Sequence, residues 1–428
     1  MNNDFNPIEL ATTSKTFCIM PWVHQYVGPV GDIKPCCVYQ HEAELGSLKE
    51  NTLEEIWNSD ASKQLRLKLL NNEIEPNCNR CEHIDVRTGL NQKFFEKNKD
   101  IVQSTLSDGS VAEHKLVYMD VRFNNLCNFS CRTCSPHFST NWVMDYRKLH
   151  NLANTENTNL FHDGYHFPGK TEAQALEEIL PHLKSMQEIY FAGGEPMMQE
   201  EHYKVLQKLI EVDNVNCIIR YNTNFSKLKL GQHDVIEYWK HFDNIYLCTS
   251  IDGSHSKAEY WRHGTDWQTI VDNRIRLMNE IPDIQFHIAY TLSWVNAHNL
   301  VEFHKEWIEL GYLEPNSIDI SLLGGPDYYS LQNIPDWKKQ QIETLFREHM
   351  KWLIELDKPT DLVVSLYEAA ITFMWKISGD VNENLKHFNR ITTKLDNIRQ
   401  ENFFETFPEH MDILDYMTLN NLRATFDY

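Results

Sequence analysis

The sequence has no long apolar run, no run of basic residues and no targeting segment. No stretch approaches the roughly 20 apolar residues that a helix needs to cross a bilayer. The first fifteen residues are polar and mixed, unlike a secretory signal or an Arg-rich transit peptide. A net charge of -21 without a basic patch disfavours binding to phosphate backbones or anionic lipid. We therefore expect a cytoplasmic protein that binds neither nucleic acid nor membranes.

The chain also lacks a fixed-period repeat, which argues against a solenoid, and it has no cysteine beyond residue 248. Its 428 residues exceed one typical domain, and its 42% hydrophobic and 12% aromatic content is sufficient for a sizeable, well-packed core. In a reducing compartment, the ten cysteines are expected to be ligands, catalytic groups or small core residues rather than disulfides.

Short β-branched or aromatic runs alternate with longer stretches of helical spacing from residue 115 onward. The runs cover residues 115–123, 188–191, 217–221, 244–251, 284–292 and 318–323. A strand followed by a helix, six times over, predicts parallel βα units. We expect an α/β fold with a partial (β/α)6 TIM-like barrel and its chemistry at the carboxyl ends of the strands. An open doubly wound sheet is the alternative.

Two regions flank this barrel. Residues 1–114 contain five of the ten cysteines and a predicted helix over 52–70, and residues 336–428 predict helices over 337–356, 361–377 and 385–403. The expected domains are therefore 1–114, a barrel over 115–335 and a helical C-terminal extension over 336–428. We interpret the extension as packing or as scaffold on the substrate side.

Three cysteines occupy one short loop directly after the first predicted strand: Cys127, Cys131 and Cys134. Thiolates are the preferred ligands of iron–sulfur clusters. Three of them can hold three irons of a 4Fe-4S cube, which leaves the fourth iron open to a small chelating molecule. The alternative is a zinc site with His137 as the fourth ligand.

The spacing of these cysteines resembles the radical S-adenosylmethionine superfamily, although Thr133 replaces the aromatic residue that usually precedes the third cysteine. The resemblance implies that S-adenosylmethionine chelates the open iron. One electron, delivered by an external reductant such as flavodoxin or ferredoxin, would then cleave its sulfonium bond. The resulting 5′-deoxyadenosyl radical would abstract hydrogen from a substrate, so the cofactor carries the difficult chemistry.

Polar or glycine-rich segments end the later strands and resemble the cofactor-binding segments of this family. The implied cofactor-binding residues are Gly193, Gly194, Glu195, Pro196, Asn222, Ser250, Asp252 and Arg262. The glycine-rich segment would bind the methionine amino group, and the strand-end hydroxyl and carboxylate two residues apart suit a ribose or an ammonium. The guanidinium would pair with the cofactor carboxylate. The alternative for residues 193–196 is a plain turn from strand to helix. For Asn222 it is a helix cap, and for Arg262 it is a surface salt bridge.

A second cysteine set lies in the N-terminal region: Cys18, Cys36, Cys78 and Cys81. The arrangement of Cys18, Gly31 and Cys36 resembles the opening of the SPASM domain, and four thiolates match its single-cluster form, twitch. The resemblance implies one auxiliary 4Fe-4S cluster bound by all four. The domain normally follows the barrel, whereas here it precedes it. A zinc ribbon is the alternative, and Cys37 could replace Cys36.

Together these patterns predict an oxidoreductase-type radical S-adenosylmethionine enzyme. Because SPASM and twitch relatives commonly modify peptides, proteins or small carbohydrate-like molecules, a peptide or protein is the expected substrate. Two alternatives are a zinc-stabilised binding protein without redox chemistry and an iron–sulfur electron-transfer protein that does not cleave the cofactor.

Overall fold

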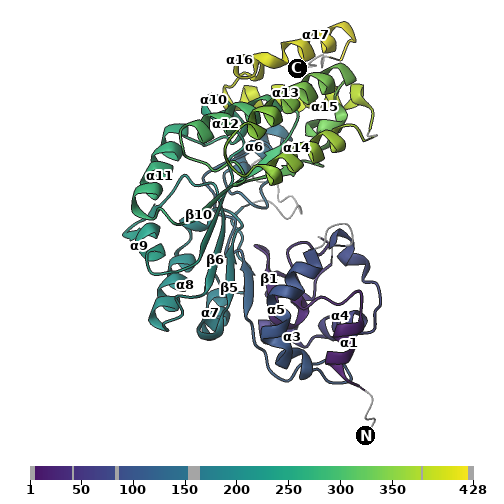
Figure 1. Ribbon diagram of the computed structural model, residues 1–428, viewed down its shortest axis with the longest axis vertical. Coiled ribbons are helices and arrows are strands. Elements are labelled where there is room, and N and C mark those ends of the chain that lie inside the picture. The colour runs from purple at the N-terminus through teal and green to yellow at the C-terminus, as the bar shows by residue number, and fades with distance from the viewer. Residues whose placement is uncertain (1–4, 41–42, 82–85, 153–163, 377–378, 423–428) are drawn as a thin grey trace. The chain divides into compact units, whose positions relative to one another are not determined.

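The computed structural model describes residues 5–40, 43–81, 86–152, 164–376 and 379–422. The chain forms two compact units (Figure 1). The first unit comprises residues 1–126, 165–221 and 229–245, and the second comprises residues 127–164, 222–228 and 246–428. Each unit therefore contains part of the segment predicted to form the barrel.

The first unit is built on a largely parallel sheet with the strand order β6-β5-β4-β1-β2-β3. The strands are β1 (His24–Val27), β2 (Asp32–Lys34), β3 (Gly46–Ser47), β4 (Tyr118–Val121), β5 (Glu188–Phe191) and β6 (Ile218–Thr223). Strands β1, β4, β5 and β6 are parallel, whereas β2 and β3 are antiparallel additions. The N-terminal region thus contributes a strand, β1, to the edge of the parallel sheet.

The helices of the first unit are α1 (Pro7–Thr13), α2 (Met20–Val23), α3 (Leu53–Trp57), α4 (Asp60–Leu70), α5 (Val86–Gln103), α7 (Gln174–Ile179), α8 (Glu200–Glu211) and α9 (Val235–Trp239). The prediction of a single helix over 52–70 is wrong, because Asn58 and Ser59 are not helical and separate α3 from α4. The Ser59 side chain accepts a hydrogen bond from the backbone of Ser62 and caps α4. A capping box of Thr52 and Glu55 starts α3 separately.

The second unit contains three parallel strands, β9 (Ile245–Thr249), β10 (Gln285–Leu292) and β11 (Ile318–Leu322). Its helices are α6 (Trp142–Leu149), α10 (His255–Trp261), α11 (Trp267–Glu280), α12 (Ala297–Glu309), α13 (Asp336–Ile354), α14 (Asp361–Met374), α15 (Val381–Arg399), α16 (Phe403–Thr406) and α17 (Met411–Leu419). Figure 1 shows α13 to α17 gathered in one helical group. The helix predicted over 385–403 ends early, because Gln400 adopts a left-handed conformation (φ 58°).

These elements confirm the predicted α/β fold with a largely parallel sheet and a helical C-terminal region. Each of the six predicted strands is present, as β4, β5, β6, β9, β10 and β11. Strand β10 shows why the prediction worked, since its buried residues alternate with partly exposed ones along its length. The predicted domain boundaries at residues 114 and 335 stay a prediction.

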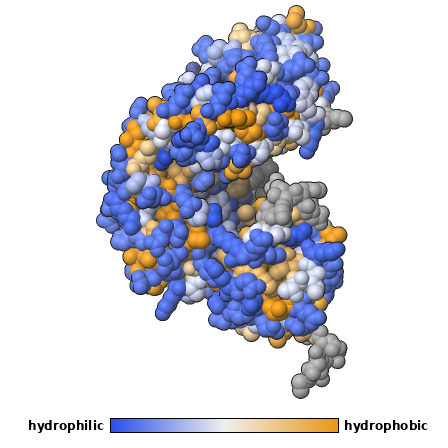
Figure 2. Space-filling view, in the orientation of Figure 1, coloured by the Kyte–Doolittle hydropathy of each residue, from blue (hydrophilic) through white to orange (hydrophobic). Residues whose placement is uncertain are grey.

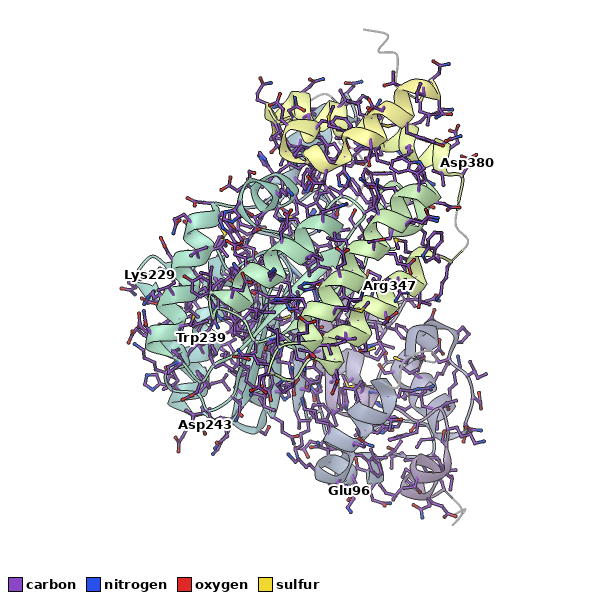
Figure 3. All side chains as sticks on the ribbon, turned by 45° about the horizontal axis from the view of Figure 1, so that its top comes forward. Glu96, Lys229, Trp239, Asp243, Arg347 and Asp380 are labelled. Atoms are coloured by element: carbon purple, nitrogen blue, oxygen red, sulfur yellow. The ribbon has the colours of Figure 1, made fainter. Side chains whose placement is uncertain are left out.

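The surface of the described residues agrees with the composition. Among the described helices, none combines the length and apolar character needed to span a membrane. Figure 2 shows hydrophilic residues over most of the visible face, with hydrophobic residues in separate areas. Figure 3 shows many charged and polar side chains on the outer faces of the helices, among them Glu96, Arg347 and Asp380.

Candidate functional site

The loop with three cysteines, residues 127–134, lies in the second unit, and N–H groups reach two of its three sulfur atoms. The Nδ2 atom of Asn224 lies 3.9 Å from Sγ of Cys127, and the backbone nitrogen of Phe129 lies 3.4 Å from the same sulfur. The Nη1 atom of Arg262 lies 3.7 Å from Sγ of Cys131. Hydrogen bonds to sulfur help to set the potential of an iron–sulfur cluster, so the loop fits such a cluster.

Burial raises the pKa of two thiols in this loop. Burial raises the pKa of Cys131, although the nearby Arg262 opposes the shift. Burial also raises the pKa of Cys134 to about 12, and the charge of Cys131 adds to that effect. Metal binding therefore has to displace protons from these sulfur atoms, as it does at other thiolate sites.

Residues 261–264 fix the backbone of the cysteine loop. The backbone nitrogen of Arg132 donates to the carbonyl of Trp261 at 3.0 Å. Gly264 has a φ of +106°, and a Cβ atom there would lie 2.8 Å from the carbonyl oxygen of Asn128. Only glycine allows this close approach of the two segments without strain.

Asp252 and Arg262 form a buried ion pair beside the loop. Their Oδ2 and Nε atoms are 2.7 Å apart, and the side chains are 0% and 14% exposed. The second oxygen of Asp252 accepts a hydrogen bond of 2.6 Å from the backbone of Thr291. Burial raises the pKa of Asp252, whereas Arg262 opposes the shift. The contacts of these two residues with a cofactor stay a prediction, and the structure shows that they bind each other.

Asn222 and Ser250 lie at the ends of neighbouring segments in the same unit, and both are partly buried. The backbone nitrogen of Ser250 donates to the carbonyl of Thr223 at 2.8 Å. The Thr223 hydroxyl and the Asn224 amide oxygen accept backbone hydrogen bonds from the next turn. The second unit therefore contains the three cysteines together with Asn222, Ser250, Asp252 and Arg262.

The predicted glycine-rich segment, residues 193–196, follows β5 in the first unit. Gly193 has a φ of +111°, and a Cβ atom on Gly194 would lie 2.2 Å from the carbonyl oxygen of Leu126. The backbone nitrogen of Glu195 donates to the same carbonyl at 2.7 Å, and the buried Glu195 side chain accepts from the backbone of Met197. The glycines thus allow two chain segments to pack closely, and their approach to a cofactor stays a prediction.

The four N-terminal cysteines of the predicted auxiliary site lie within electrostatic range of one another in the first unit. Burial is the main cause of the raised pKa of Cys18, Cys36, Cys78 and Cys81. Cys18 and Cys78 also raise the pKa of Cys36, and Cys18 and Cys81 raise the pKa of Cys78. The sequence-predicted set is therefore brought together by the fold.

Cys37 has a different environment from Cys36. Its thiol donates a hydrogen bond to Asp120, and the charges of Asp120 and Arg122 act on its pKa, which burial raises to about 11. Neither Cys18 nor Cys78 is among the causes of that shift. The two adjacent cysteines therefore differ in their surroundings, and Cys36 as the ligand stays a prediction.

The choice between a zinc ion and an iron–sulfur cluster at the N-terminal thiols stays a prediction. Among the residues that the structure describes, no group of three or more His, Cys, Asp or Glu side chains is arranged to hold one metal ion. A structural zinc site needs four ligands on one ion, with sulfur about 2.3 Å from it. A 4Fe-4S cube instead distributes its thiolates over four irons.

A row of polar and ionisable side chains crosses the sheet of the first unit and was missed in the sequence. One position on each of β2, β1, β4, β5 and β6 forms the row: Lys34, Tyr26, Asp120, Tyr190 and Arg220. Arg122, which directly follows β4, donates to Asp120 at 2.5 Å, and its Cζ atom lies 4.4 Å from the ring centre of Tyr26. Parallel strands are usually apolar on both faces, so this polar face is a candidate substrate surface. Its signal in the sequence is the alternation of polar and apolar residues from 118 to 122.

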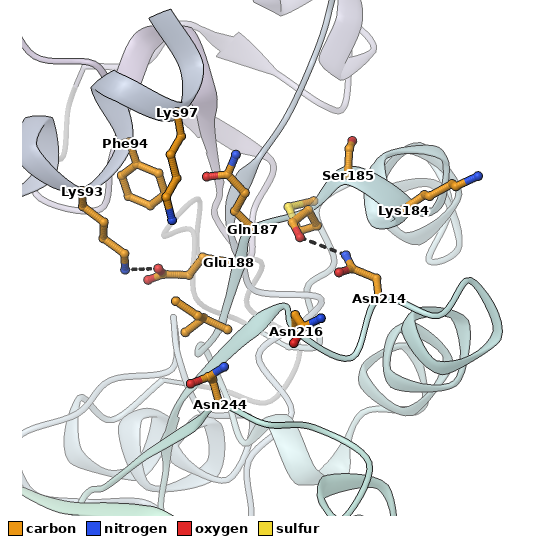
Figure 4. Close-up of a pocket in the computed structure, with 12 residues that line it drawn as sticks. Lys93, Phe94, Lys97, Lys184, Ser185, Gln187, Glu188, Asn214, Asn216 and Asn244 are labelled. Carbon is orange, nitrogen blue, oxygen red and sulfur yellow. Dashed lines mark hydrogen bonds and ion pairs between the residues drawn. The ribbon is translucent and has the colours of Figure 1, made fainter.

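A cavity of about 470 Å³ opens at the amino ends of β5 and β6, and Figure 4 shows the residues that line it. Its buried carboxylate, Glu188, is bonded by Lys93 and lies 2.6 Å from Nε of Arg220. The charge of Glu188 is therefore neutralised within the protein. The cavity contains none of the predicted site residues, and its buried carboxylate has a structural explanation.

Comparison with known families gives one match, to the SPASM iron–sulfur cluster-binding domain, over residues 18–82. The match confirms the resemblance of the N-terminal cysteine set to the SPASM domain. No curated protein matches the chain.

Several solved structures match part of the chain. Native anSMEcpe with bound AdoMet and Cp18Cys peptide is 14% identical, with a TM-score of 0.37, over 56% of this chain and 61% of that chain. SuiB from Streptococcus suis, bound to S-adenosylmethionine, is 11% identical, with a TM-score of 0.33, over 61% and 50% of the two chains. TYW1 with a lysine-pyruvate adduct bound is 12% identical, with a TM-score of 0.30, over 58% and 75%. The chain thus spans 61% of the length of the first of these proteins.

Proposed function

We propose that this chain, which carries a SPASM-type segment at residues 18–82, is a radical S-adenosylmethionine enzyme. In this proposal Cys127, Cys131 and Cys134 bind a catalytic 4Fe-4S cluster whose fourth iron is open to S-adenosylmethionine. The observation that carries the proposal is the loop of three thiols with N–H donors at two of its sulfur atoms. When bound, the cluster supplies one electron that cleaves S-adenosylmethionine into methionine and a 5′-deoxyadenosyl radical.

The residues around the loop bind and orient in this proposal. Asn224 and the backbone of Phe129 donate to Cys127, and Arg262 donates to Cys131, so the charged form of each sulfur is stabilised. Asp252 holds Arg262 in place, because it occupies the Nε side of the guanidinium and leaves Nη1 directed at the sulfur.

Contacts with the cofactor are assigned to the remaining strand-end residues. These are Asn222 and Ser250, together with the glycine-rich segment Gly193, Gly194, Glu195 and Pro196. Their support is their position at the carboxyl ends of parallel strands, where ligands of α/β folds bind: Asn222 lies in the last part of β6, and the others follow β9 or β5. An external reductant such as flavodoxin or ferredoxin completes the reaction.

We assign a second, auxiliary 4Fe-4S cluster to Cys18, Cys36, Cys78 and Cys81. Its support is the SPASM match and the mutual electrostatic effect of these thiols. In this proposal Cys37 is not a ligand of the cluster, and its side chain forms a hydrogen bond with Asp120.

The proposed substrate is a peptide or protein. The polar row on the sheet of the first unit supports this class, because its phenols, Tyr26 and Tyr190, can exchange hydrogen bonds with peptide groups.

The test uses the full chain, purified and reconstituted without oxygen. The proposal expects about eight irons per chain, the content of two cubes, and formation of 5′-deoxyadenosine when dithionite and S-adenosylmethionine are added. Cys127→Ala should abolish that product, whereas Cys248→Ala, in β9 outside the proposed ligand set, should retain it. Undiminished cleavage by Cys127→Ala would contradict the ligand assignment. A colourless protein with bound zinc would favour a zinc-stabilised binding protein, and two clusters without cleavage would favour an electron-transfer protein.

A further inference from the structure

Arg132, the residue after the second cysteine of the loop, is held by the C-terminal helical region. Its side chain is 1% exposed, and its Nη2 atom lies 2.5 Å from Oδ1 of Asp396 and 2.6 Å from Oε2 of Glu401. A guanidinium removed from water in this way is tolerated only when its charge is paired. Asp396 lies in α15 and Glu401 directly follows it, so the loop depends on residues far along the chain.

Both carboxylates have further partners that fix their positions. The Tyr260 hydroxyl donates to Oδ1 of Asp396 at 2.7 Å, and its ring centre lies 3.7 Å from Cζ of Arg132. The Nδ1 atom of His263 lies 2.6 Å from Oε1 of Glu401. The network therefore joins the cysteine loop, residues 260–263 and the end of α15 through short, charge-assisted bonds, which are stronger than neutral ones.

A second set of contacts holds the same loop from the same helix. The Nη2 atom of Arg399 donates to the carbonyl of Ser130 at 2.7 Å. On the other side, the indole nitrogen of Trp142 donates to the carbonyl of Cys131 at 2.6 Å, and Leu395 of α15 packs in a cluster with Trp142. Helix α15 thus contacts the loop by ion pairs, by a backbone hydrogen bond and through apolar packing.

We infer that the segment from α15 to Glu401 positions the catalytic cluster loop and that Arg132 is its positioning residue. This inference rests on the proposed function, because it assumes a cluster at residues 127–134. A cube held by three thiolates has no fourth protein ligand to retain it, so the loop itself must keep the sulfur atoms in place. When the bond between Arg132 and the carboxylates is weakened, the spacing of the sulfur atoms relaxes and iron is lost.

The first experiment compares Arg132→Lys with a matched control in the reconstituted full chain. Lysine keeps the charge but lacks the planar group, whose Cζ atom lies 3.7 Å from the ring centre of Tyr260 in Arg132. The control is Arg347→Lys on the surface of α13, where Arg347 also pairs with two carboxylates, those of Glu343 and Glu368, but is 47% exposed (Figure 3). The readouts are iron release to a chelator, the electron paramagnetic resonance spectrum of the reduced protein and the rate of 5′-deoxyadenosine formation.

For Arg132→Lys we expect release that is roughly tenfold faster. It should affect about half of the iron, that is one cube of two. The rate of cofactor cleavage should fall in parallel, and the spectrum of the remaining auxiliary cluster should be unchanged. Arg347→Lys should behave as the unmodified protein. Equal iron release by the unmodified protein and Arg132→Lys would overturn the inference, as would equally fast release by the control.

A charge-neutral variant separates positioning from general loss of stability. Arg132→Gln alone leaves two buried carboxylates without a cation, whereas Arg132→Gln combined with Asp396→Asn and Glu401→Gln leaves an uncharged network. The triple variant should retain iron better than Arg132→Gln, because effects within one network are not additive. If Arg132→Lys does not fold, Glu401→Gln gives the same comparison with a smaller change. A protein that retains iron but forms no 5′-deoxyadenosine would refute the proposed function, while the iron-release comparison would still test the role of α15.

Discussion

The buried ion pair of Asp252 and Arg262 gives the sharpest prediction for stability. In Asp252→Asn, the side chain keeps an oxygen that can accept from the backbone of Thr291, now 2.6 Å from the carboxylate. It loses the charge that faces Nε of Arg262 at 2.7 Å. Since the Arg262 side chain is only 14% exposed, water cannot replace the missing carboxylate.

The size of the effect follows from this geometry. Loss of one partner of a buried ion pair costs about 3–5 kcal/mol, because the other charge stays buried and unpaired. Asparagine retains the hydrogen bond to Thr291, which contributes about 1 kcal/mol. We therefore expect Asp252→Asn to lower the free energy of unfolding by about 3 kcal/mol, or roughly a hundredfold in the unfolding equilibrium.

Urea unfolding of the full chain, followed by tryptophan fluorescence, measures this loss. The control is Asp319→Asn, at an exposed position of β11, which should shift the free energy by less than about 0.5 kcal/mol. In a double-mutant cycle, Asp252→Asn with Arg262→Gln should be less destabilised than the sum of the two single variants. Additivity within about 0.5 kcal/mol would refute the reasoning, since it would show that the two side chains act independently.

Three further predictions concern the cysteines, the glycine-rich segment and acid stability. Cys36→Ala should lose about half of the iron, one cube of two, whereas Cys37→Ala should keep it, and an iron assay of the two purified variants checks this. Gly194→Ala should raise the KM for S-adenosylmethionine in the 5′-deoxyadenosine assay, because the added Cβ would lie 2.2 Å from the carbonyl oxygen of Leu126. An unchanged KM would argue against a role of this turn in binding the cofactor. Burial lowers the pKa of His304 from 6.5 to about 4, so the unfolded chain takes up the proton first and stability should fall as the pH drops from 6.5 to 4. The loss at this site is about 3 kcal/mol, and urea midpoints at pH 7 and pH 5 should differ less in His304→Gln than in the unmodified protein.

The parallel strands were predictable because their local pattern agrees with their environment. The run at 188–191 was found with the same bounds as β5, and 318–323 differs from β11 by one residue. Strand β1 was missed, because its sequence, His24-Gln25-Tyr26-Val27, is not a run of β-branched residues. Its conformation comes from pairing with β4, whose residues are distant in sequence, and local propensity does not contain that information.

The ligand thiols were found because their spacing is local, whereas the groups that support them come from distant segments. Asp396 and Glu401 look in sequence like ordinary surface carboxylates at a helix end, and the sequence indicates for the C-terminal region only packing or a scaffold on the substrate side. Only the fold brings them to Arg132. The same holds for the ion pair of Asp252 with Arg262, which the spacing of the two residues in the sequence does not predict. Residues that contact a cluster loop through long-range ion pairs therefore lie beyond sequence reasoning of this kind.

The parallel pairing of β1 with β4 also affects how the polypeptide is made and how it could be engineered. Because β1 is synthesised well before β4, β1 cannot form its parallel pairing until the intervening segment and β4 have been synthesised. Removing the N-terminal region would leave the hydrogen-bonding groups of β4 bare along one side, and such an edge promotes aggregation. The N-terminal region therefore cannot be removed, or moved to another protein, as an independent unit. Shortened forms of this polypeptide should retain β1.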